Sequence, residues 1–253
     1  MVIERNPVSK MISVPLPDGG DLDVYVARPE GEPRGGLVLI HEIWGLVDHI
    51  RDVADRFAAE GWLVAAPDIL SHAGIAPALG EELFSLMNSE DEEVRIAAQP
   101  RMREALAGRQ APEYSGWAVS ALRAVVDWLE AQPGVDGRIA STGFCFGGTY
   151  TFLLAAADDR VKAAVPFYGT APEPEQMATI SAPVLAIYGQ NDPAIVEPLP
   201  TVTGQMKAAG VDFQTIVYPD SAHAFFNDTG LRYNAADAAD AWRRATEFLS
   251  THV

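Results

Sequence analysis

The sequence is poor in cysteine and contains only one, Cys145, in 253 residues. A single cysteine cannot form a disulfide within the chain, which is typical of proteins from a reducing compartment. The sequence also lacks any run of about 18 apolar residues, the length that a membrane-spanning helix requires. Its first ten residues, MVIERNPVSK, do not resemble a signal peptide. We therefore expect a soluble protein of the cytoplasm.

Positive charge is scarce as well, because 18 lysines and arginines stand against 35 aspartates and glutamates, which gives a net charge of −17. Such a surface repels nucleic acids and anionic membranes, so neither is an expected partner. It also repels an anionic substrate at long range unless a local basic pocket compensates. The expected partner is a small molecule, and the protein is expected to be a monomer or a homodimer.

Spacing suited to metal ligands is missing too. The stretch HEIWGLVDH, residues 41–49, does not place its histidines and carboxylates on one face of a helix. The sequence therefore predicts neither a metal nor a cofactor.

Strand and helix patterns alternate from residue 36 to the end of the chain. Apolar runs such as GGLVLIHE, WLVAAPDI, VKAAVPFYG and PVLAIYG predict strands that are buried on both faces. Residues 10–16 and 22–28 predict a hairpin around PDGGD. The alternation predicts an α/β fold, a single domain over residues 1–253 with a mostly parallel sheet and helices on both faces. Residues 71–113, interrupted by prolines, predict a small helical cap inserted into it.

The cysteine lies in the stretch RIASTGFCFGGTY, between a predicted strand and a predicted apolar helix. A strand that turns directly into a helix presents the turn residue above the sheet, where the helix N-terminus stabilises a thiolate. Gly143 and Gly147 fit this turn because larger side chains would collide there. The pattern Gly-x-Cys-x-Gly predicts a nucleophile elbow with cysteine in place of serine. The alternative is a buried, inert cysteine beside a turn.

A nucleophile needs a base, and the base needs a group that orients it. Around such an elbow the acid and then the histidine follow the nucleophile in the chain. Asp192 follows the strand LAIYG, and His223 follows the next strand, IVYP. The alternatives are a turn-forming aspartate and a loop histidine, and Asp220 competes with Asp192 as the orienting acid.

These motifs resemble those of the dienelactone hydrolase family. HEIWG, GFCFGG, YGQNDP and AHAF occur in the order of that family and with about its spacing, over roughly residues 10–250. The resemblance implies an α/β-hydrolase fold with Cys145 as nucleophile, His223 as base and Asp192 as the orienting acid.

The resemblance also implies a role for Glu42, which in relatives contacts the resting thiol and helps to generate the thiolate. A structural salt bridge is the alternative, because a carboxylate at the end of a buried strand is costly unless it is paired or protonated. The backbone N–H groups of Phe146 and Ile43 are expected to form the oxyanion hole. His41 is expected to support the loop.

Two arginines that bind the substrate carboxylate in dienelactone-cleaving members are missing, and His72 and Asn227 stand at those points. Arg101, Arg103 or Arg109 in the cap could reach the pocket from another direction. The expected pocket is aromatic, which favours a neutral substrate. Its predicted substrate-binding residues are Trp44, His72, Tyr168 and Phe225, with further aromatics at Phe144, Phe146 and Phe226.

The sequence therefore predicts a hydrolase of activated esters or lactones of the dienelactone type that forms an acyl-enzyme on cysteine. The nearer alternative is a general carboxylesterase or thioesterase that acts on neutral aryl or acyl esters. The more distant one is a binding protein that uses Cys145 as a redox-sensitive thiol.

Overall fold

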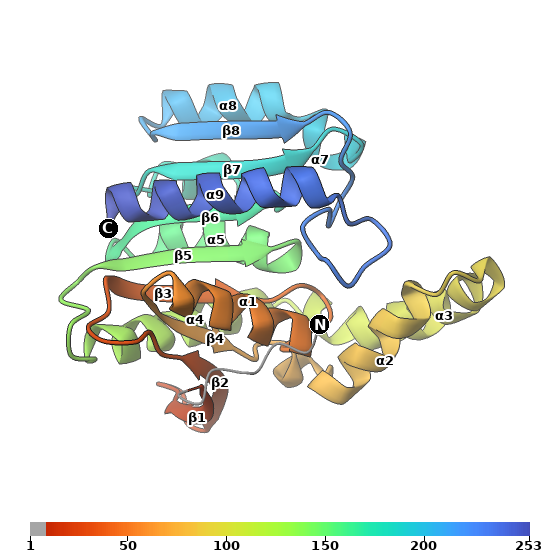
Figure 1. The fold of residues 1–253 in the computed structure, drawn as a ribbon, viewed down its shortest axis with the longest axis horizontal. Coiled ribbons are helices and arrows are strands. Elements are labelled where there is room, and N and C mark those ends of the chain that lie inside the picture. The colour runs from red at the N-terminus through yellow and green to blue at the C-terminus, as the bar shows by residue number, and fades with distance from the viewer. Residues whose placement is uncertain (1–8) are drawn as a thin grey trace.

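The computed structural model describes residues 9–253 and is built around one eight-stranded sheet (Figure 1). The strand order is β1-β2-β4-β3-β5-β6-β7-β8. Pairing is parallel from β4 through β3 to β8, and antiparallel where β2 joins β1 and β4. The strands are β1 (Lys10–Pro15), β2 (Asp21–Ala27), β3 (Gly35–Ile40), β4 (Trp62–Pro67), β5 (Ile139–Phe144), β6 (Val161–Phe167), β7 (Val184–Gly189) and β8 (Phe213–Tyr218).

The parallel strands are apolar because both of their faces are covered. Every residue of β3, β4, β5 and β7 is buried, as the continuous apolar runs predict. The predicted hairpin is confirmed as β1 and β2, which pair in antiparallel register around a turn closed between Leu16 and Gly20. The predicted α/β class, with a mostly parallel sheet between helices, is confirmed.

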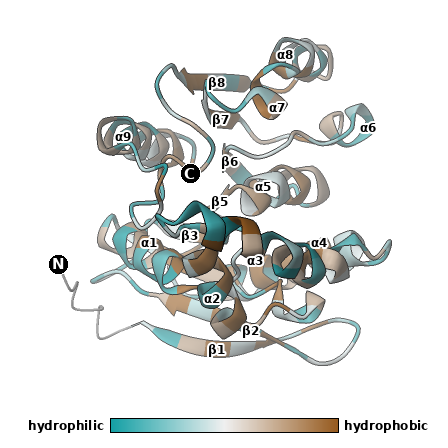
Figure 2. Ribbon diagram, turned by 90° about the vertical axis from the view of Figure 1, so that its right-hand side faces the viewer, coloured by the Kyte–Doolittle hydropathy of each residue, from teal (hydrophilic) through white to brown (hydrophobic). Residues whose placement is uncertain are grey.

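Helices cover the sheet in two layers, seen edge-on in Figure 2. One layer contains α1 (Asp48–Ala59) and α9 (Ala235–His252), whose apolar residues pack into one core. The other layer contains α4 (Tyr114–Glu130), α5 (Phe146–Ala157), α6 (Pro174–Met177) and α8 (Leu199–Ala208), which pack into a second core. The short α7 (Pro193–Val196) follows β7.

Residues between β4 and α4 form the segment η1 (Ser71–Ala73), α2 (Pro77–Met87), α3 (Glu92–Ala105) and η2 (Leu106–Gln110). In Figure 1, α2 and α3 extend away from the sheet. Gly80 fixes α2 against the loop after β3, because a Cβ at this position would lie 1.7 Å from the backbone oxygen of Trp44. The contact holds this segment beside the carboxyl end of β3.

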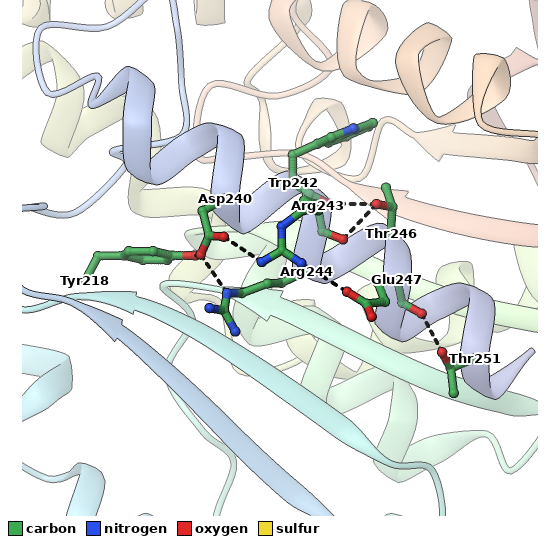
Figure 3. A network of polar contacts seen from close by, with 8 residues as sticks. All are labelled: Tyr218, Asp240, Trp242, Arg243, Arg244, Thr246, Glu247 and Thr251. Carbon is green, nitrogen blue, oxygen red and sulfur yellow. Dashed lines mark hydrogen bonds and ion pairs between the residues drawn. The ribbon is translucent and has the colours of Figure 1, made fainter.

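The long loop between β8 and α9 is anchored at both ends. Asn234 caps α9 by accepting a hydrogen bond from the backbone N–H of Asp237. Asp240 accepts hydrogen bonds from Tyr218, at the end of β8, and from Arg243 (Figure 3). This cluster ties α9 to β8 and closes the base of the loop. Among residues 9–253, no helix is long and apolar enough to cross a membrane.

Candidate active site

Cys145 occupies the turn between β5 and α5, with a φ of 56° that non-glycine residues rarely adopt. The glycines around it are required by close backbone contacts. A Cβ at Gly143 would lie 2.4 Å from the oxygen of Gly147, and a Cβ at Gly147 would lie 2.1 Å from the oxygen of Ile40. The local sequence therefore forms the sharp, strained turn that the spacing predicts and raises the thiol above the carboxyl edge of the sheet.

His223 and Asp192 meet at the same edge of the sheet. Nδ1 of His223 lies 2.5 Å from Oδ2 of Asp192, and their side chains are 29% and 12% exposed. An ionised aspartate can only accept, so Nδ1 donates and Nε2 is left free as a proton acceptor. The two loops are joined by the backbone N–H of Asn191, which donates to the oxygen of Ser221. Asp192, and not Asp220, is the carboxylate that contacts this imidazole.

The thiol of Cys145 is half-buried and is held in its neutral form. Its pKa is raised to about 12, first by burial and then by the negative charges of Glu42 and Asp192. The backbone N–H of Phe146 and the charge of Arg109 act in the opposite direction. Among the described residues, no hydrogen bond joins this thiol to the ring of His223. The resting site therefore holds a protonated thiol and not a thiolate.

Glu42 is a buried carboxylate with only one of its two oxygens hydrogen-bonded within the described chain. Its Oε2 accepts a hydrogen bond of 2.7 Å from Nδ2 of Asn227, while Oε1 has no partner among the described residues. The buried hydroxyl of Tyr168 has none there either. Burial, and then the charge of Glu42, raise the pKa of Tyr168 well above its ordinary value. A carboxylate, a phenol and a thiol thus share one buried space.

His41 joins the carboxyl ends of β3 and β4. Its Nε2 accepts a hydrogen bond from the backbone N–H of Ile69, and its Nδ1 lies 2.7 Å from the backbone oxygen of Glu42. Since Nε2 accepts, Nδ1 carries the proton and donates it to that oxygen. Burial lowers the pKa of His41, which favours this neutral ring. The ring also stacks on Phe146, so it fixes the backbone of Glu42 beside the elbow.

Two backbone N–H groups near the thiol are the predicted oxyanion donors. Phe146 begins α5, and Ile43 follows Glu42 in the loop after β3. Within residues 9–253, neither N–H donates to another backbone oxygen. The N–H of Ile43 is therefore without a backbone acceptor in this range, whereas that of Phe146 faces the resting thiol. The oxyanion hole stays a prediction.

The sequence model of the Dienelactone hydrolase family matches residues 22–253 of this chain. The chain belongs to the dienelactone hydrolase family. A relative from Escherichia coli strain K12, named "Putative carboxymethylenebutenolidase", is 32% identical over 97% of this chain and 88% of its own. A relative of the same name from Saccharolobus solfataricus is 31% identical over 92% of this chain and 95% of its own.

Solved structures of dienelactone hydrolases have the same fold. The structure named "Putative Dienelactone Hydrolase" from Klebsiella pneumoniae aligns with a TM-score of 0.81 and 28% identity, over 96% of this chain and 98% of that one. A "Dienelactone Hydrolase-like Promiscuous" phosphotriesterase from metagenomic libraries aligns with a TM-score of 0.69 and 25% identity, over the same shares. The fold is therefore the α/β-hydrolase fold that the family resemblance implies.

A cavity of about 650 Å³ lies next to these residues. Ile43, Ala224 and Asn227 line it, and each adjoins or contacts a residue of the proposed site. Its apolar walls come from the loop after β3, from the segment between β4 and α4, and from the loop before α9. These wall residues are Trp44, Phe84, Met87, Met102, Leu106 and Leu231.

The structure does not gather all the predicted substrate-binding residues at this cavity. Trp44 lines it, packed edge-on against Phe84. Tyr168 is buried beside Glu42, and Phe225 is fully buried between Tyr168 and Tyr218. His72 stacks on Trp117 in a separate hollow. Phe144, Phe146 and Phe226 are likewise buried, so the expected aromatic pocket is replaced by one of mixed aliphatic and aromatic character.

Residues that sequence reasoning did not single out lie in the walls. Asn227 stood out only as the point where an arginine is missing, but its amide is the donor to Glu42. Arg95 and Arg232 also line the cavity and were not singled out from the sequence. Of the cap arginines considered, Arg101 is held by Glu82, whereas the charge of Arg109 reaches the thiol. No group of three or more histidine, cysteine or acidic residues within the described chain could hold a metal.

Proposed function

We propose that this protein hydrolyses activated esters or lactones through an acyl-enzyme on Cys145, with His223 as base and Asp192 as the acid that orients it. The observation that carries the proposal is the 2.5 Å contact between His223 and Asp192 at the edge of the sheet where the elbow presents the thiol. An inert cysteine would need neither an oriented imidazole nor a strained turn.

The proposed cycle begins with the neutral thiol. Nε2 of His223 takes the thiol proton, and the thiolate attacks the ester carbonyl carbon while the N–H groups of Ile43 and Phe146 stabilise the oxyanion. The imidazolium returns the proton to the leaving oxygen as the C–O bond breaks, which leaves a thioester on Cys145. His223 then takes a proton from water, the hydroxide cleaves the thioester, and the proton returns to sulfur.

Glu42 controls when this proton leaves. Its charge disfavours a second negative charge nearby, so the thiol stays neutral while the site is empty. The family resemblance implies that Glu42 also helps to form the thiolate once substrate enters. Its unpartnered Oε1 is the atom available for that task.

The chemistry of sulfur sets the preferred leaving group. The tetrahedral intermediate can expel either the thiolate of Cys145 or the alcohol oxygen of the substrate. Because a thiolate is a good leaving group, an intermediate with a poor alkoxide mostly expels the thiolate and returns to the starting ester. Enol esters, enol lactones and aryl esters are therefore expected substrates, and simple alkyl esters and amides are expected to react poorly. A general carboxylesterase or thioesterase activity is the nearer alternative, favoured by the cavity volume of about 650 Å³.

The test compares a dienelactone with a neutral aryl ester, using wild type, Cys145→Ala and Cys145→Ser. We expect turnover of at least one of these activated substrates, none by the alanine variant, and a shifted ranking of aryl and alkyl esters with the serine variant. Turnover that survives in Cys145→Ala would contradict the cysteine mechanism. An unchanged ester ranking with serine would contradict the explanation of leaving-group preference.

A further inference from the structure

The cavity beside the proposed site combines an apolar body with positive charge. Arg95 of α3 and Arg232 of the loop before α9 both line it, and Glu90 is the one acidic residue among its lining residues. This local excess of positive charge is unusual because the chain as a whole carries a net charge of −17.

Within the part of the chain that the structure describes, the two arginines also lack the carboxylate partners that other arginines of the molecule have. Arg101 lies 2.8 Å from Glu82, and Arg160 lies 2.7 Å from Asp158. Among residues 9–253, Arg95 and Arg232 have no carboxylate within 4.0 Å. In so acidic a protein, guanidinium groups without a carboxylate partner are free to take an anion from solution.

Arg95 is held in place while its charge remains uncompensated. It is half-buried, and its guanidinium donates hydrogen bonds of 2.6 and 2.9 Å to the backbone oxygens of Ser89 and Glu90. A guanidinium has five N–H donors, so these contacts leave others for a ligand. The loop before α9 is tied to the end of α2, since the backbone N–H of Leu231 donates to Oδ1 of Asn88, the residue that follows this helix. Arg232 follows this anchored residue directly.

One cavity borders the proposed catalytic residues and also carries this charge. Ile43, Ala224 and Asn227 adjoin the proposed catalytic residues, whereas Arg95 comes from the helix pair that extends away from the sheet (Figure 1). Trp44, Met102 and Leu106 contribute apolar surface to the same space. A volume of about 650 Å³ is in the range of cavities that hold drug-sized molecules.

We propose that the substrate is an amphiphile, an ester or lactone with an extended apolar body that ends in an anionic oxygen group, a carboxylate or a phosphate, bound by Arg95 and Arg232. This inference rests on the proposed function, because it assigns the substrate class of the same site. The two arginines offset the repulsion that the net charge of −17 imposes on any anion.

The test uses two p-nitrophenyl esters of equal length, the octanoate, which is neutral, and the hemisuberate, which ends in a carboxylate. Wild type is expected to hydrolyse the hemisuberate with a kcat/KM about tenfold or more above that of the octanoate, and added salt should reduce this preference. An ester that ends in phosphate, compared at the same length, distinguishes the two anion classes. Equal or lower kcat/KM for both anionic esters would overturn the inference.

Variants locate the effect. Arg95→Gln and Arg232→Gln are each expected to lower kcat/KM for the hemisuberate about 10- to 100-fold, mainly through KM, and to leave the octanoate within about twofold. The matched control is Arg103→Gln, because Arg103 is exposed on the same helix as Arg95 and does not line the cavity. Parallel losses with both esters would show that the arginines only support the wall.

A binding measurement separates failure of this inference from failure of the proposed function. Calorimetry with Cys145→Ala is expected to show that the hemisuberate binds at least tenfold more tightly than the octanoate, and that Arg232→Gln removes this difference. If wild type turns over neither ester, the proposed function is wrong, and calorimetry still decides the anion site. Equal binding of the two esters overturns the site whatever the activity.

Discussion

Alkylation of the single thiol should be slow in the native protein and fast in the unfolded chain. The fold raises the pKa of Cys145 from 9.0 to about 12, which lowers the thiolate fraction near neutral pH by about 10³. A more basic thiolate is intrinsically more nucleophilic, with a Brønsted slope of about 0.4–0.5, which returns a factor of about 20. We therefore expect native Cys145 to react about 50-fold more slowly than the unfolded chain at pH 7.5.

The assay follows iodoacetamide addition by intact mass, in buffer and in denaturant. Since the chain has one cysteine, the unfolded protein is its own reference. Below its pKa the native rate should rise tenfold per pH unit, and it should still be rising above pH 9.5, where the unfolded chain levels off. A native thiol that reacts faster than the unfolded one, or a plateau below pH 8, would refute the neutral resting thiol.

Glu42→Gln distinguishes a raised pKa from simple shielding of the thiol. The charge of Glu42 is the second cause of the raised pKa, after burial. Removing that charge should lower the pKa and accelerate alkylation of the native protein, while ester turnover falls. An unchanged alkylation rate would mean that the charge of Glu42 does not contribute to the raised pKa.

Three further predictions concern stability and orientation. In denaturant titrations, Gly147→Ala should lower the free energy of unfolding by at least about 2 kcal/mol, because its Cβ would lie 2.1 Å from a backbone oxygen. The control Gly116→Ala, in open space on α4, should raise it by about 0.5–1 kcal/mol. Asn227→Ala should cost about 1–3 kcal/mol in the same titrations, because a buried carboxylate loses its donor, and an unchanged midpoint would contradict this. Asp192→Asn should lower kcat by about 10²–10⁴ at nearly constant KM, while Glu197→Gln, exposed just after α7, should not change kcat.

The framework of the fold and the elements of the site at the sheet edge are predictable because they depend on local pattern. Buried parallel strands read as continuous apolar runs, and their carboxyl ends meet at one edge. Residues in the loops just beyond these strand ends must therefore lie near one another. Cys145 directly follows β5, and Asp192 and His223 lie three and five residues beyond the ends of β7 and β8, so their loops could be placed from the chain order.

The cavity walls could not be predicted, since they depend on packing between segments far apart in the sequence. Asn88 meets Leu231 across 143 residues, and His72 stacks on Trp117 instead of entering the cavity. Side-chain direction within a loop is equally non-local. Phe225 lies two residues after His223 but is buried in the core, and the intervening Ala224 has a φ of 64° that the sequence does not predict.

The most direct test of the cysteine mechanism is the mass of the enzyme during turnover. The protein is mixed with excess p-nitrophenyl ester, quenched in acid within the first turnovers, and analysed as intact mass and as peptides. We predict a mass increase equal to the acyl group, located on the peptide that contains Cys145, and its absence in Cys145→Ala. Wild-type turnover without this adduct under conditions that give a burst of nitrophenol, or an adduct on another residue, would contradict an acyl-enzyme on Cys145.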